Sequence, residues 1–161
     1  EILRCLVGSE MCIRDSFNTV FLAFHAAQHY ARGLALHHLC DWACLLNRYG
    51  LHIPEEVTDI RFRNMILAMT RLCNDYLGTS VPVYGGEGLA EEILWEIIRP
   101  PYTKFVPAKN KWSILVYKTK RMLHTHRACN SVLRISLCKW VGNSILLHLR
   151  SPHTIFQTER K

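Results

Sequence analysis

Apolar residues recur every three or four positions along most of the chain, which is the spacing of amphipathic helices. The first such stretch includes Phe21 and Phe24 and predicts a helix over 19–32. Asn18 can accept a hydrogen bond at its start, and Gly33 can end it in a left-handed conformation. We therefore expect the first helix to lie between these two residues.

The same spacing, interrupted by Gly and Pro, predicts further helices. They cover 35–49, 59–77, 89–98, 112–126 and 132–149. No stretch alternates as a β-strand does, and there is no internal repeat. We read 85–88, GGEG, as a flexible loop, because it lacks the Lys-Ser/Thr of a phosphate-binding P-loop. The sequence predicts an all-α protein, a bundle of about six helices.

The first sixteen residues do not share this pattern with the rest of the chain. Back-translated in a single frame, EILRCLVGSEMCIRDS matches the transposase adapter used in sequencing libraries. Segments of this kind are excluded from reasoning about a fold. We therefore expect 1–16 to be non-native and disordered or weakly packed, 17–153 to form one helical domain, and 154–161 to be a loose tail. The native N-terminus is then expected to be missing.

Charge is distributed unevenly along a chain whose net charge is +7. From Lys104 to the end the only acidic residue is Glu159. This asymmetry indicates an anionic partner, such as a nucleotide, a nucleic acid or an acidic lipid, or else a solvated basic face. The basic run at 118–121 fits the outer face of an amphipathic packing helix better than a single-strand binder.

Apolar stretches and cysteines bear on the compartment. No apolar run is long and uncharged enough to span a bilayer, so we expect a soluble helical protein. The cysteines after residue 16 form no CxxC pair, and we expect buried thiols in a reducing, cytoplasmic environment. They are Cys40, Cys44, Cys73, Cys129 and Cys138.

The densest group of polar side chains lies in the first two predicted helices. His25 and His29 are four residues apart, with Arg32 almost one turn further, and His37 and Asp41 are also four apart. Imidazoles at this spacing can bind zinc, with a carboxylate completing the set, and would then make the chain a metallohydrolase. The same residues could instead line a ligand pocket, or form a hydrogen-bonded layer with an ordinary His37–Asp41 pair.

The stretch FNTVFLAFHAAQHYARGLALHHLCDWACLL resembles the C-terminal half of uncharacterised bacterial nucleotidyltransferase-like proteins of the polymerase-β-type superfamily. The matching positions are His25, His29, Gly33, Leu36, Leu39, Asp41 and Trp42. His37 stands where the family often has Arg. The resemblance covers about 17–77 well and the remainder loosely.

The resemblance implies a missing N-terminal half with a Gly-Ser turn and an Asp-x-Asp pair. Those acids would hold Mg²⁺, which bridges a nucleoside triphosphate and activates an unknown acceptor. No cofactor is expected on this fragment, which alone would be inactive. Its expected role is a pocket wall formed by His25, His29, Arg32, His37 and Asp41. The alternative is a non-catalytic helical module that binds an anionic partner through its basic C-terminal part.

Overall fold

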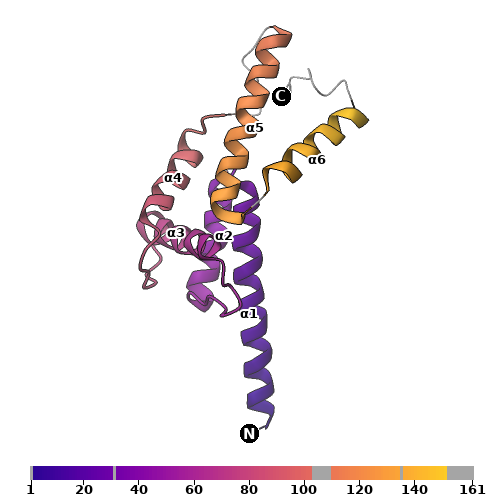
Figure 1. The fold of residues 1–161 in the computed structure, drawn as a ribbon. Helices are drawn as coiled ribbons and strands as arrows, with labels where there is room; N and C mark the ends of the chain where they lie inside the picture. The colour runs from indigo at the N-terminus through magenta and orange to yellow at the C-terminus, as the bar shows by residue number, and fades with distance from the viewer. Residues whose placement is uncertain (1, 31, 103–109, 135, 152–161) are drawn as a thin grey trace.

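The computed structural model of the chain describes residues 2–30, 32–102, 110–134 and 136–151, and within them it consists of α-helices with no strand (Figure 1). The helices are α1 (Ile2–His29), α2 (Leu36–Tyr49), α3 (Ile60–Leu77), α4 (Glu87–Ile98), α5 (Lys111–Leu133) and α6 (Leu137–Arg150). The all-α fold with about six helices is confirmed. The expected tail at 154–161 lies outside the described residues.

Helix α3 lies at the centre of the fold, packed against α1, α2, α4 and α5. Two buried side-chain hydrogen bonds join it to α2. The indole Nε1 of Trp42 donates to the hydroxyl of Thr70 over 3.1 Å, and the thiol of Cys73 donates to the carbonyl of Leu39 over 3.3 Å. Figure 1 shows α6 directed away from the other helices.

The core is formed by apolar side chains of the first four helices, with a contribution from the end of α5. Helix α1 contributes three alanines, whose small side chains allow neighbouring helices to approach closely. The larger side chains that are almost completely buried include Trp42, Met65, Ile66, Met69, Ile93 and Val132. The end of α1 and the start of α2, which together we call the α1–α2 corner, are therefore positioned by a continuous apolar core.

Local capping chemistry explains why α3 matches its predicted range. The carboxylate of Asp59 accepts a hydrogen bond from the backbone N–H of Arg61 over 2.8 Å, and so caps the helix. Gly78 ends it with φ 72° and ψ 21°, the left-handed conformation that glycine adopts readily. Both signals depend only on adjacent residues, so the sequence was sufficient.

The first helix differs from its prediction at both ends. Helix α1 already begins at Ile2, so Asn18 lies inside it and does not cap it. Nothing between the two segments breaks a helix, and residues 2–29 continue as one. The helix ends at His29, before the predicted end at 32, while Gly33 adopts a positive φ of 136° in the turn that follows. Whether 1–16 are native stays a prediction.

The boundaries of α4, α5 and α6 also differ from those predicted. Helix α4 begins at Glu87, so half of the GGEG stretch is helical, and Gly86 is buried. Helix α5 continues to Leu133, because no Gly or Pro interrupts it. It ends where Arg134 adopts a left-handed backbone with φ 43° and ψ 56°. The sequence does not predict this conformation, because an arginine rarely adopts it.

All five cysteines were expected to be buried, but three of them are exposed. Cys73 and Cys129 are buried, but Cys40, Cys44 and Cys138 are exposed, and all five are free thiols. The prediction failed because Cys40 and Cys44, one turn apart, lie on the outer face of α2. Among the described residues no helix is long and apolar enough to cross a membrane.

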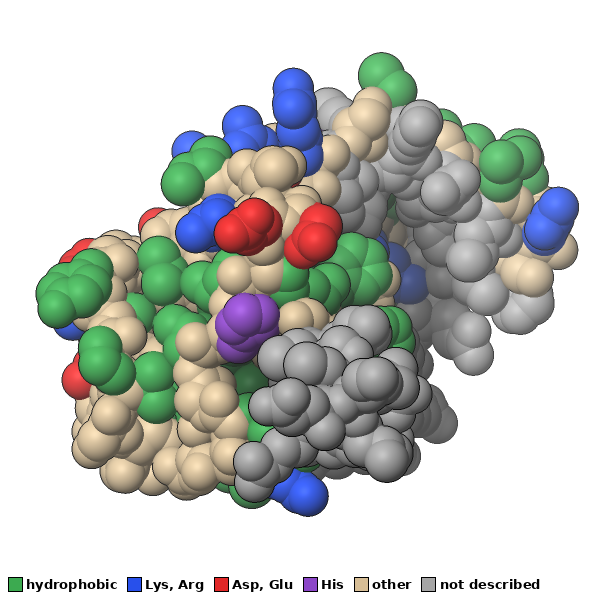
Figure 2. Space-filling view, turned by 90° about the horizontal axis from the view of Figure 1, so that it is seen from below, with side chains coloured by type: hydrophobic (Ala, Val, Ile, Leu, Met, Phe, Trp, Pro, Cys, Tyr) green, Lys and Arg blue, Asp and Glu red, His purple; other side chains and the backbone are tan. Residues whose placement is uncertain are grey.

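Figure 2, seen from below relative to Figure 1, shows how charge is distributed on one face. Several Lys and Arg side chains lie along the upper edge of this view, beside apolar and acidic groups, and others are scattered around the rim. The basic residues after 102 fall partly outside the described residues.

Candidate functional site

The last turn of α1 carries two histidines on one face. His25 and His29 are one turn apart, and their ring centroids are 4.7 Å apart with the rings inclined by 64°. The helix stops here because the chain turns, with the N–H of Arg32 donating to the carbonyl of His29 over 2.9 Å. The positive φ of Gly33 allows the chain to continue into α2 after a few residues.

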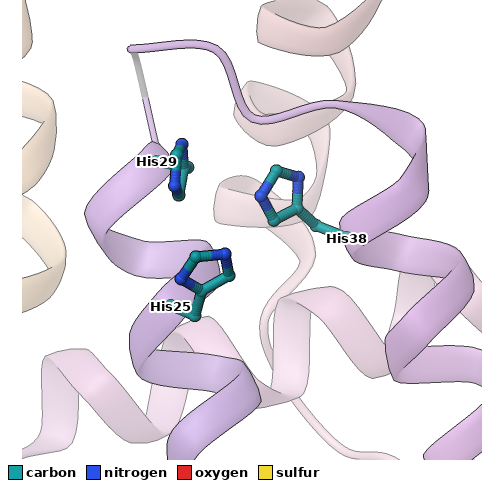
Figure 3. Close-up of side chains that lie close together, drawn as sticks. All are labelled: His25, His29 and His38. Carbon is teal, nitrogen blue, oxygen red and sulfur yellow. The ribbon is translucent and has the colours of Figure 1, made fainter.

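A third histidine, His38, comes from the first turn of α2. Its ring centroid lies 4.9 Å from that of His29 and 5.4 Å from that of His25. Only 6% of its surface is exposed. In Figure 3 the rings of all three residues point into the space between α1 and α2. Two helices thus bring three imidazoles together at one corner of the fold.

The backbone of Ala35 holds the His38 ring. The N–H of Ala35 lies 3.1 Å from Nδ1 of His38, and the carbonyl oxygen of Ala35 lies 3.2 Å from the same atom. One of these groups can hydrogen bond to Nδ1 in either tautomer. The other ring nitrogen, Nε2, is buried and has no hydrogen-bond partner. Buried polar atoms are normally paired, so this nitrogen is an exception that calls for an explanation.

The electrostatic environment keeps His38 uncharged. Burial is the main cause that lowers the pKa of its imidazole; the hydrogen bond to the Ala35 backbone opposes it, and the neighbouring His37, His29 and His25 each lower the pKa by a smaller amount. His38 is therefore neutral at pH 7 and offers a lone pair rather than a positive charge.

The expected site residues are only partly brought together. His25 and His29 meet as predicted, and they are joined by His38, which was not among the predicted site residues. His37 is exposed, with its ring centroid 3.9 Å from that of His38. Asp41 is exposed as well, and the described residues show no ion pair between it and His37.

Arg32 lies in a different environment from the three histidines. It is exposed, and its charge acts on the thiol of Cys129 on α5, partly offsetting the rise in pKa that burial causes there. The guanidinium therefore sits close to α5.

A signal for His38 was present in the sequence. The buried face of α2 includes Trp42 and Leu45. These lie four and seven residues after His38, which is the spacing of one helix face. His38 belongs to that face and His37 does not, so the helical register alone distinguishes the two.

A second polar group joins α1, α4 and α5. The hydroxyl of Tyr30 donates to Oε2 of Glu92 over 3.2 Å, and Nε2 of His124 lies 3.2 Å from Oε1 of Glu96. Burial raises the pKa of the Glu96 carboxyl, which the charge of His124 partly opposes. The ring of Tyr102 packs 5.2 Å from that of His124. These contacts tie the helices together and include no activated nucleophile.

Among the described residues, His25, His29 and His38 are the group of side chains with the geometry to hold a metal ion. Comparisons with protein-family models, with curated proteins and with solved structures found no match for the chain.

Proposed function

We propose that the chain is the helical C-terminal region of a nucleotidyltransferase-like protein, whose catalytic half precedes Phe17 in the intact protein. In this proposal the α1–α2 corner forms a wall of the pocket for the nucleotide or its acceptor. The observation that carries it is that His25 and His29, two residues of the family-like pattern, face each other and His38 at the corner.

Three other residues of the pattern support that corner, whereas Leu36 and Asp41 are exposed. Trp42 and Leu39 are buried and bond to α3, and Gly33 has the positive φ that the turn requires. His25, by contrast, is exposed, so packing of the core does not explain its place in the pattern.

The Mg²⁺ implied by the resemblance does not fit the residues of this corner. Magnesium prefers oxygen ligands and octahedral geometry, whereas the corner offers three imidazole nitrogens. We therefore assign Mg²⁺ and the transfer chemistry to the Asp-x-Asp half, and no chemical step to this chain. Its own contribution would be to position a substrate group through the N–H groups of exposed histidines.

A second candidate is a non-catalytic helical module that binds an anionic partner. The observation that favours it is the nearly complete lack of acidic residues after Lys104. Helix α5 carries Lys111, Lys118, Lys120, Arg121 and Arg127 and no acid. Such a module would bind through charge alone, so its affinity would fall steeply with ionic strength.

The locus itself tests the proposal. Reading the DNA upstream of the codon for Phe17 should reveal an open reading frame that encodes a Gly-Ser turn followed by Asp-x-Asp. A native start codon near Phe17, or an upstream frame without those acids, would contradict the proposal and leave the binding module.

The restored full-length protein then allows a functional test. With Mg²⁺ and radiolabelled nucleoside triphosphates, we expect label transfer that is abolished when the Asp-x-Asp acids become Asn. His25→Gln should lower kcat/KM, whereas Glu55→Gln, at an exposed position in the connection after α2, should leave it unchanged. Equal rates for both variants would exclude the corner from the substrate pocket.

A further inference from the structure

We propose that His25, His29 and His38 bind a transition-metal ion of the zinc class. This inference does not rest on the proposed function, because the three ligands all belong to this chain. It also departs from the expectation that the fragment carries no metal. Each histidine offers one ring nitrogen, and these three atoms lie within 4.8 Å of one another.

The position of His38 is the observation that points to a ligand. Its side chain is more than nine-tenths buried, its Nε2 has no hydrogen-bond partner, and its ring points toward the other two imidazoles (Figure 3). A hydrogen-bonded polar layer would have paired this nitrogen with a neighbour. A metal ion at the centre of the group supplies the missing partner.

The backbone of Ala35 completes the arrangement expected around a metal-binding histidine. Metal-bound imidazoles usually donate their second N–H to a carbonyl or carboxylate, which fixes the tautomer and the ring orientation. The carbonyl of Ala35 lies 3.2 Å from Nδ1 of His38. When Nδ1–H donates to this carbonyl, the lone pair of Nε2 is left for the ion.

The donor atoms define the class of metal. Neutral imidazole nitrogens suit Zn²⁺, Co²⁺, Ni²⁺ and Cu²⁺, and are poor ligands for Mg²⁺ and Ca²⁺. In a tetrahedral zinc site, bond lengths of about 2.0–2.1 Å place the nitrogens about 3.3 Å apart. Side-chain rotation of the exposed His25 can supply much of the required closure.

Three protein ligands leave one coordination position open. This arrangement is typical of zinc sites at which water or a substrate group binds, whereas structural sites use four protein ligands. The open position would take water or an anionic oxygen. The site lies at the end of α1, where His25 is exposed and a small ligand can reach the ion.

The experiment is a Co²⁺ titration of the untagged, chelator-treated chain, followed by visible absorption and by competition with Zn²⁺. We expect one ion per chain with a tetrahedral spectrum. His29→Gln and His38→Gln should each weaken binding by at least about tenfold, because a ligand is lost. His25→Gln should weaken binding as well, and because His25 is exposed, its replacement leaves the packed core unchanged.

Two variants provide matched controls. His37→Gln changes the adjacent exposed histidine, and His52→Gln changes an exposed histidine in the connection between α2 and α3. Both should bind Co²⁺ as the unmodified chain does. Zn²⁺ should also raise the melting temperature of the unmodified chain and of these controls, because it binds the folded state.

Three results would overturn the proposal. The first is a stoichiometry well below one ion per chain. The second is an equal loss of affinity in His37→Gln and His38→Gln, with circular dichroism showing that both variants are folded. The third is a sulfur-to-cobalt charge-transfer band in the near ultraviolet, which would place the ion on cysteines such as the exposed pair Cys40 and Cys44.

Discussion

Replacing Gly86 with alanine should destabilise the fold strongly, because this glycine lies directly against the backbone of α3. It precedes α4 with φ 83° and ψ 0°, in the left-handed region. A Cβ atom at this position would lie 2.7 Å from the backbone nitrogen of Ala68 and 2.9 Å from the carbonyl carbon of Leu67. Both atoms belong to the backbone of the central helix and cannot rotate away.

Two costs add in this variant. A residue with a Cβ atom in the left-handed conformation costs roughly 1–2 kcal/mol. Forcing an extra carbon into a packed interface typically costs about 1–3 kcal/mol, as side chains and backbone shift. We therefore expect Gly86→Ala to lower the free energy of unfolding by about 2–5 kcal/mol, a large part of the roughly 5–15 kcal/mol typical of a whole domain.

Gly88 provides a control of the opposite sign, two residues away. It lies within α4, has no positive φ, and an added Cβ would meet nothing within 4 Å. Alanine is favoured over glycine inside a helix by about 0.5–1 kcal/mol. Gly88→Ala should therefore stabilise the protein by about that amount.

Urea unfolding of both variants, followed by far-ultraviolet circular dichroism, measures the two changes. We expect a lower urea midpoint for Gly86→Ala and a slightly higher one for Gly88→Ala than for the unmodified chain. A Gly86→Ala variant within about 0.5 kcal/mol of the unmodified chain, the range of a neutral surface substitution, would refute the close approach of α4 to α3.

Three further predictions concern the core, pH and thiols. Thr70→Val should cost about 1–3 kcal/mol in urea unfolding, because it leaves the indole N–H of Trp42 unpaired in the core; a change below about 0.5 kcal/mol would contradict this. Burial lowers the pKa of His38 below 6.5, so its contribution to stability is complete above that pH and is lost as the pH falls toward the folded-state pKa. His38→Gln should flatten the dependence of unfolding free energy on pH in this window, and an unchanged slope argues against a buried neutral imidazole. In native protein a thiol reagent should modify the exposed cysteines of α2 and α6 but spare Cys73 and Cys129. Burial shields these two thiols from the reagent and raises their pKa. Mass mapping that finds either residue labelled without denaturant would contradict the packing.

The sequence predicted helices well where the signals were local. Asp59 and Gly78 mark the ends of α3 because capping depends on hydrogen bonds and backbone angles of neighbouring residues. The end of α5 was missed because Arg134 takes a left-handed conformation that only the surrounding fold can impose. The start of α1 was missed because Asn18 is compatible with a cap and with a helix interior alike.

The connection before α4 was misread for a different reason. GGEG has the composition of a flexible loop, yet Gly86 is buried and the guanidinium of Arg71 donates to the carbonyl of Gly85 over 3.3 Å. The side chain of Asn74 also bonds to both the N–H and the carbonyl of Val81. These contacts join residues distant in sequence, so composition could not reveal them.

The candidate site was half predicted. The spacing of His25 and His29 placed them on one face, and the structure brings them together. His38 was missed because His37 was paired with Asp41, although the spacing of His38 with Trp42 and Leu45 marks His38 as the buried residue of the two. How closely the three rings approach depends on the packing of α1 against α2, a tertiary property that the sequence does not show.

The most direct test of the account is a crystal structure of the chain grown with Zn²⁺, with anomalous diffraction data collected at the zinc absorption edge. We expect an anomalous peak between α1 and α2, about 2.0–2.1 Å from one nitrogen of each of His25, His29 and His38. A structure in which these rings point apart, or in which the peak lies on cysteines or on other histidines, would contradict the central claim.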